Sequence, residues 1–215
     1  SNIITSGSNF LITANNTNGN ATYQLFVNGS TTALNTQTTA SYSFTDTNVT
    51  VNKNYELKIT QGITTFIAKF SVVINGTPVV SALIPAGLVD GINYNISDPT
   101  KATLVLNAPL KSFVYVAGSF NNWQPTSAYA MKKDNTSGST KFWLELTGLT
   151  PGQIYTYQYW VCDVVNLPLG SPAIVKTADP FSTLVLSPFD DPEIQTLGVF
   201  PNLPTYPVGQ EREVS

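Results

Sequence analysis

The sequence predicts an all-β protein, with two tandem immunoglobulin-like β-sandwiches followed by a proline-rich extended tail. Short runs of β-branched and aromatic residues alternate with polar residues and are interrupted by Gly, Asn and Pro. Almost no stretch has the character of a helix. This pattern stops and restarts near residue 78, so we expect one domain at residues 1–77, a second at 78–187 and a linker at 188–215.

The first domain has five predicted strands. Asn28-Gly29 is a strong hairpin signal because both residues tolerate the left-handed backbone of a tight turn. Tyr55, Leu57 and Ile59 alternate with charged residues, so these three side chains should face the core. The predicted strands are residues 10–14, 22–27, 41–45, 54–60 and 63–73.

The second domain repeats the pattern with six predicted strands. In the fourth of them, Tyr155, Tyr157 and Tyr159 share one face and should point into the core. Gln158 and Trp160 then share the opposite face, where an indole needs a ligand or a protein surface to cover it. The predicted strands are residues 102–106, 112–117, 142–146, 154–161, 173–176 and 183–186.

The last segment changes in character, because five prolines fall within it and little alternation remains. Proline cannot donate to a sheet ladder, so this spacing favours extended chain over strand pairing. We therefore expect residues 188–215 to be a linker toward a missing domain, which the resemblance described below implies to be catalytic. The prolines are Pro188, Pro192, Pro201, Pro204 and Pro207.

Composition excludes several classes of function. The chain of 215 residues has no histidine, which excludes a Ser-His-Asp triad, a Cys-His pair and a His-ligated metal. A net charge of −3 gives no footprint for nucleic acid or an anionic membrane. Cys162 is the single cysteine and should be a buried, inert thiol. We expect no cofactor, no metal and no membrane insertion.

The charged residues make up 11% of the chain, against a usual share of roughly 25%. Amide and hydroxyl side chains must therefore solvate the surface, as in many exported β-proteins. We expect an exported bacterial protein, located at the cell surface, in the periplasm or in the medium. The carboxylates fall singly in turns and in the tail, so no pair of the kind that a glycosidase needs is visible, and this region should not be an enzyme.

Four motifs of the second domain resemble the family 48 carbohydrate-binding modules, which bind starch and glycogen. They are GSFNNW at residues 118–123, FWLEL at 142–146, LTPGQIYTYQY at 149–159 and ADPF at 178–181. The resemblance covers the chain from about residue 85 onward. It implies an early-set immunoglobulin-like sandwich at the N-terminal side of an α-amylase-family enzyme, glycoside hydrolase family 13. A preceding sandwich of this kind is typical of Bacteroidetes-type surface amylases.

The resemblance and the residues together predict an α-glucan site at the turn around residue 123. The ring of Trp123 can cover the apolar face of a glucose unit if it is exposed, as we expect from its polar neighbours. Amides carry both a donor and an acceptor for the sugar hydroxyls. The predicted ligand-binding residues are Trp123, Asn121, Asn122, Gln124, Gln158, Trp160 and Lys132.

Two alternatives remain open at this stage. Both sandwiches could act as a spacer and brace for a catalytic barrel without binding sugar, or they could form a non-carbohydrate adhesion surface. The family's second tryptophan is missing after Cys162-Asp163, although Trp160 could replace it. Trp143 could equally be structural, and Lys132 with Lys133 could be a solvated basic pair. The expected partners are an α-glucan and the catalytic domain of the full-length chain.

Overall fold

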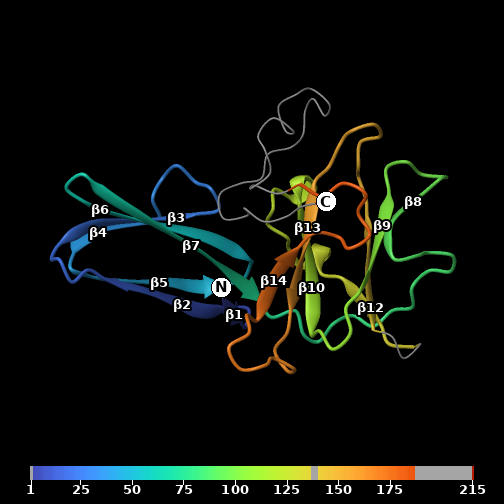
Figure 1. Ribbon diagram of the computed structural model, residues 1–215, viewed down its shortest axis with the longest axis horizontal. Coiled ribbons are helices and arrows are strands. Elements are labelled where there is room, and N and C mark those ends of the chain that lie inside the picture. Colours follow the sequence, from blue (N-terminus) through green and yellow to red (C-terminus); the bar gives the residue numbers. More distant parts are fainter. Residues whose placement is uncertain (1, 137–139, 187–214) are drawn as a thin grey trace. The chain divides into compact units, whose positions relative to one another are not determined.

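The protein is all-β in the computed structural model, which describes residues 2–136, 140–186 and 215. Within these residues there is no α-helix, and the chain forms two compact units (Figure 1). The first unit runs to Asn75 and the second begins at Gly76. No helix in the described part of the chain has the length and apolar character to cross a membrane.

The first unit holds two sheets. Five strands pair in the order β1-β7-β6-β3-β4, and β2 pairs with β5. All pairs are antiparallel except the parallel pair of β1 with β7. The strands are β1 (Asn2–Ile4), β2 (Ser8–Asn15), β3 (Ala21–Val27), β4 (Asn35–Thr39), β5 (Ser41–Val49), β6 (Lys53–Gln61) and β7 (Thr64–Ile74).

The core of the first unit takes side chains from both sheets. Tyr23, Tyr55 and Leu57 come from the larger sheet and Tyr42 from the smaller one, and all four are buried. The rings of Tyr23 and Tyr42 stack with their centroids 5.0 Å apart. The predicted inward alternation of the strand at 54–60 is thus confirmed for Tyr55 and Leu57, while Ile59 packs against the edge of this core.

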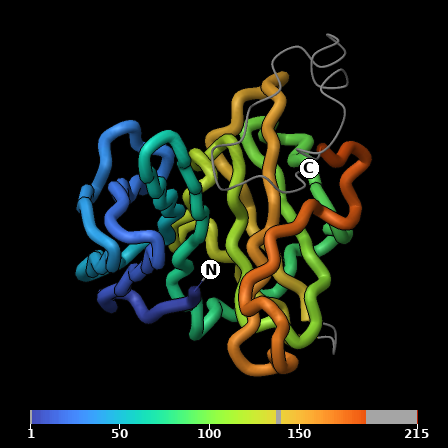
Figure 2. Tube along the Cα trace, turned by 60° about the vertical axis from the view of Figure 1, so that its left-hand side comes forward, coloured from blue at the N-terminus to red at the C-terminus, as the bar shows by residue number. Residues whose placement is uncertain are grey.

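The second unit also holds two sheets, in the orders β11-β12-β9-β8 and β10-β13-β14. Figure 2 shows its long extended segments, coloured from green to orange, running beside one another. Its buried core contains Leu104 and Phe142 from the first sheet and Val114 and Tyr159 from the second, so the core lies between them. The strands are β8 (Gly91–Tyr94), β9 (Ala102–Asn107), β10 (Phe113–Gly118), β11 (Lys132–Asp134), β12 (Lys141–Leu146), β13 (Tyr157–Cys162) and β14 (Ile174–Thr177). Two short 3-10 turns are η1 (Ser119–Asn121) and η2 (Ser127–Tyr129).

Two predicted strands of the second unit need correction. The strand expected at 154–161 begins only at Tyr157, because the turn around Pro151-Gly152 continues past Tyr155, whose hydroxyl accepts a hydrogen bond from the Thr150 amide. Residues 183–185, expected in a strand, lie outside any strand. The predicted linker at 188–215 lies outside the described residues except for Ser215.

Candidate ligand-binding site

The GSFNNW segment forms a closed loop at the end of β10. A Cβ on Gly118 would lie 2.6 Å from the carbonyl oxygen of Thr156, so only glycine fits there. The Asn121 side chain accepts a hydrogen bond from the Gly118 amide and donates one to the Val116 carbonyl, both at 2.9 Å. The backbone amide of Trp123 donates to the Gly118 carbonyl at 2.9 Å, which closes the loop.

The predicted exposure of Trp123 is wrong, because its side chain is only 2% exposed. Two consecutive left-handed residues, Asn122 at φ 53° and Trp123 at φ 60°, reverse the chain here. The side-chain amide of Asn121 is hydrogen-bonded to the backbone of the loop, so this polar residue does not indicate that the loop surface is exposed to solvent. Burial of an indole removes a large apolar area from water, which explains why the ring lies inside.

The remaining predicted residues near this loop differ in their exposure and in their contacts. Asn122 is exposed and Gln124 is half-buried, with its backbone amide bonded to the Asn121 carbonyl. The ammonium of Lys132 lies 4.5 Å from the ring centroid of Trp143, in cation–π geometry. The Trp143 side chain is buried and donates to the Ala82 carbonyl at 3.0 Å. Trp143 is therefore structural, and Lys132 packs on it.

Gln158 and Trp160 were expected on an open face of β13, and this expectation is also wrong. Both side chains are 0% exposed. The Trp160 indole donates to Oε1 of the Gln158 side chain at 2.9 Å, and the ammonium of Lys176 lies 4.3 Å from the indole centroid. The strand is the central one of its sheet, with Tyr115 of β10 opposite Trp160 in the register. Both faces of β13 are thus buried at this point.

The burial of Trp123, Trp143 and Trp160 has a direct consequence, since the chain has only these three tryptophans. None of them offers an open indole face to a sugar in the structure. If the chain stacks on a sugar ring, tyrosine or phenylalanine must supply the aromatic face.

Cys162 is buried, and burial raises the pKa of its thiol to about 12. The thiol therefore stays protonated at neutral pH and is a poor nucleophile. The prediction of a buried, inert cysteine is confirmed. Among the described residues, no group of three or more acidic, histidine or cysteine side chains is arranged to hold a metal ion.

A groove of about 450 Å³ lies in the second unit, between the edge strand β8 and the loop that leads into β13. Tyr94, the last residue of β8, is 76% exposed at its wall. Tyr155 and Ile154 line the other side, with Thr150 and Gln153 beside them. We call this hollow the Tyr94 groove.

The Tyr155 ring is held in place before any ligand arrives. Its hydroxyl accepts a hydrogen bond of 2.8 Å from the Thr150 amide. Its ring also contacts Phe120, with centroids 6.3 Å apart, and Phe120 stacks on Tyr129 at 5.7 Å. Since Phe120 belongs to the GSFNNW loop and lines the groove, this loop shapes the groove through Phe120 and not through Trp123.

The groove suits a neutral ligand. Lys101 is the one charged side chain among the residues that line it in the described part of the chain. The Lys101 ammonium lies 3.7 Å from carboxylate oxygens of both Asp98 and Glu145, so its charge is balanced. An adjoining hollow of about 350 Å³ shares Tyr94 and Tyr155 and adds Phe181, which is 59% exposed. The two hollows together present three partly open aromatic rings.

Sequence reasoning missed this groove. Tyr155 was assigned to the core because it alternates with Tyr157 and Tyr159, and Tyr94 carried no motif. The available signal was the turn-rich Thr150-Pro151-Gly152 segment directly before Tyr155. A turn there breaks the strand alternation and frees the ring from the core face.

No protein-family model matches the chain, and no curated protein matches it either. The resemblance to carbohydrate-binding modules therefore depends on the four motifs alone.

Proposed function

We propose that the chain is a non-catalytic α-glucan-binding region built from two immunoglobulin-like β-sandwiches, and that it holds a larger α-amylase-family enzyme on its polymer. The support is of two kinds. The motifs of the second unit resemble family 48 carbohydrate-binding modules. The core of each unit draws on two sheets, which is the arrangement expected of a sandwich. We place the proposed sugar contact at the Tyr94 groove instead of the Trp123 turn, because Trp123 is buried.

The observation that carries this proposal is the pair of tyrosine rings at the groove, one exposed and one fixed. A pyranose ring presents an apolar C–H face and a rim of hydroxyls. Tyr94 and Tyr155 can cover such faces, while Thr150 and Gln153 stand at the wall to exchange hydrogen bonds with the rim. A site with balanced charge matches a neutral polymer.

The expected affinity is low. Covering roughly 60 Å² of apolar area per ring contributes about 1.5 kcal/mol at about 25 cal/mol/Å². After the cost of association, two or three such contacts give a Kd on the order of 0.01–1 mM. Weak single contacts suit a module that binds a long polymer repeatedly.

Affinity electrophoresis in gels containing amylopectin tests the proposal. The wild-type chain should be retarded, and Tyr94→Ala should be retarded clearly less. Phe66→Ala is the matched control, because Phe66 is also an exposed aromatic residue (62%) but lies on β7 of the first unit. It should be retarded like the wild type. Free migration of the wild type would refute α-glucan binding, and full retardation of Tyr94→Ala would refute the site.

A second candidate function is a brace that fixes the chain at the end of the second sandwich. The buried Asp179 carboxylate accepts hydrogen bonds from the Tyr157 and Tyr159 hydroxyls at 2.8 and 3.0 Å. Ser215 exchanges backbone hydrogen bonds with Tyr157 in both directions, and its hydroxyl accepts one from the Asp179 amide. If the brace is the function, the wild type migrates freely in amylopectin, and the Ser215 amide is protected from hydrogen exchange.

The remaining parts of this proposal follow from the resemblance. The parent protein would be a glycoside hydrolase family 13 enzyme, and its own catalytic domain would be the partner of this region. A charged share of 11% and a surface wetted by amides and hydroxyls support export to the bacterial surface, the periplasm or the medium. Fractionation of the native host, with an antibody against this region, tests the location.

A further inference from the structure

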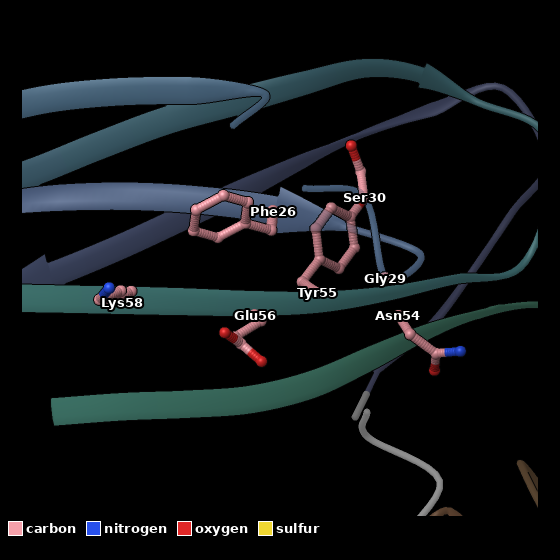
Figure 3. A pocket seen from close by; sticks show the side chains of 7 residues that line it. All are labelled: Phe26, Gly29, Ser30, Asn54, Tyr55, Glu56 and Lys58. Carbon is pink, nitrogen blue, oxygen red and sulfur yellow. The ribbon is translucent and has the colours of Figure 1, made fainter. Parts of the chain in front are cut away.

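The solvent side of the five-stranded sheet in the first unit carries a second cluster suited to a ligand. Phe26 on β3 lies directly opposite Glu56 on β6 in the antiparallel register. Lys58 follows two residues later on the same face of β6 (Figure 3). Paired positions have Cβ atoms about 5 Å apart, and next-nearest residues on one strand lie about 7 Å apart. An aromatic ring, a carboxylate and an ammonium thus branch from neighbouring positions on one face of the sheet.

These side chains line a hollow of about 210 Å³, which we call the Phe26 hollow. Its rim is the turn after β3, where Gly29 has a φ of 71° and the Ser30 hydroxyl is fixed by bonds to the backbone of Thr32 (Figure 3). Asn54 lies at the start of β6, below this turn, and its backbone amide bonds to the Asn28 side chain at 2.9 Å. The turn at one end of the hollow is therefore held by hydrogen bonds, while side chains of β3 and β6 line the rest.

Two charged side chains line the hollow, and Lys69 on β7 lies directly opposite Glu56 in the register. Glu56 and Lys58 are both partly exposed, and in the part of the chain that the structure describes they form no ion pair with each other. A carboxylate accepts from two neighbouring hydroxyls at once, and an ammonium donates up to three bonds. Hydrogen bonds to charged groups are the stronger ones, whereas exposed ion pairs contribute little. This balance favours a neutral polyhydroxyl ligand over a charged one.

We propose that the Phe26 hollow is a second carbohydrate site, which takes a single sugar residue with a vicinal diol. The ring of Phe26 covers the C–H face of the sugar, Glu56 accepts from the two adjacent hydroxyls, and Lys58 donates to a ring substituent. The site belongs to the first unit and does not depend on the Tyr94 groove. A chain with both sites would hold a polymer at two points, which raises the avidity without any new contact.

The test uses the whole chain carrying Tyr94→Ala, so that the Tyr94 groove cannot dominate the signal. Methyl α-D-glucoside is titrated up to tens of millimolar while the backbone amide resonances of Phe26, Gly29 and Glu56 are followed by NMR. These resonances should shift together and saturate. Phe26→Leu keeps an apolar side chain but loses the flat ring, and it should weaken the response about tenfold. Glu56→Gln should weaken it as well, whereas Thr36→Val on the same sheet face should not.

Three outcomes would overturn the proposal. The sugar could leave the three resonances unchanged, or shift them equally in Phe26→Leu. Glycine, a zwitterion that pairs with both charges, could shift them where the sugar does not, which would make the hollow an ion-pairing site.

Failure here is separable from failure of the proposed function. If the chain with Tyr94 intact shows sugar-dependent shifts at Tyr94 and Tyr155 only, sugar binding at the Tyr94 groove is supported and sugar binding at the Phe26 hollow is refuted. If sugar-dependent shifts appear at Phe26 only, binding at the Phe26 hollow is supported and binding at the Tyr94 groove is refuted.

Discussion

Replacement of Trp123 by alanine should destabilise the second unit instead of merely removing a sugar contact. A buried tryptophan removes roughly 200 Å² of apolar surface from water, which corresponds to about 5 kcal/mol at about 25 cal/mol/Å². Measured large-to-small substitutions of this kind cost about 3–5 kcal/mol. With a side chain that is 2% exposed, we expect a loss of about 4 kcal/mol in the free energy of unfolding. Trp123→Phe, which keeps an aromatic ring in the same space, should lose about 1–2 kcal/mol.

Urea denaturation followed by tryptophan fluorescence measures this loss. All three tryptophans lie in the second unit, so the fluorescence of Trp143 and Trp160 in the variant reports the unfolding of that unit. With an m-value of about 2 kcal/mol/M, the midpoint should fall by roughly 2 M. A midpoint within about 0.3 M of the wild type, together with lost retardation in amylopectin, would show that the ring is open to solvent and would refute the buried-loop interpretation.

Two further predictions concern the same unit. Gly118→Ala should cost roughly 1–3 kcal/mol, because its Cβ would lie 2.6 Å from the backbone oxygen of Thr156. Gly152→Ala, which meets open space at φ +80°, should cost about 1–2 kcal/mol from backbone strain alone. A melting temperature equal to that of the wild type in either variant would contradict the corresponding reason. The second prediction concerns acid. Hydrogen bonds, first from the Ile84 amide at 2.9 Å, hold the pKa of the Asp134 carboxyl below its usual value. A lowered folded-state pKa contributes stability that is complete above the unfolded-state pKa, about 3.9, and is lost as the pH falls through the folded-state value. The urea concentration at the midpoint of unfolding should therefore decrease as the pH is lowered below about 4. The decrease should be smaller in Asp134→Asn, and an identical acid dependence in both proteins would refute this role of Asp134.

The strands that the sequence could predict are those with apolar alternation. Tyr55 and Leu57 on β6 face the core as expected, because a period of two leaves one side of a strand apolar. β4 escaped prediction since its five residues, Asn35–Thr39, include no apolar side chain. It is held by backbone pairing with β3, and backbone hydrogen bonds produce no hydrophobic pattern in the sequence. Conversely, the apolar run at 183–186 suggested a strand, but residues 183–185 lie outside any strand.

The candidate site was harder to predict than the fold because exposure depends on tertiary packing. The polar neighbours of Trp123 suggested a wet surface, yet Asn121 directs its amide to the Gly118 and Val116 backbone. Alternation placed Trp160 on an open face, but a central strand can be buried on both sides. Neither fact is visible in the local sequence, since both depend on segments that are distant along the chain.

The GSFNNW loop carries two rings with different roles, so its part in stability and its part in the proposed α-glucan binding can be separated experimentally. Trp123 is buried, so its loss acts on the fraction of folded protein and leaves the groove of each folded molecule intact. Phe120 contacts Tyr155, so its loss removes a wall of the Tyr94 groove and the ring that orients Tyr155. A Trp123 variant measured well below its melting temperature should therefore keep its affinity for α-glucan, while a Phe120 variant should lose affinity at any temperature. In this chain the motif thus forms a closed loop, and it contributes to the proposed sugar site only through the Phe120 ring.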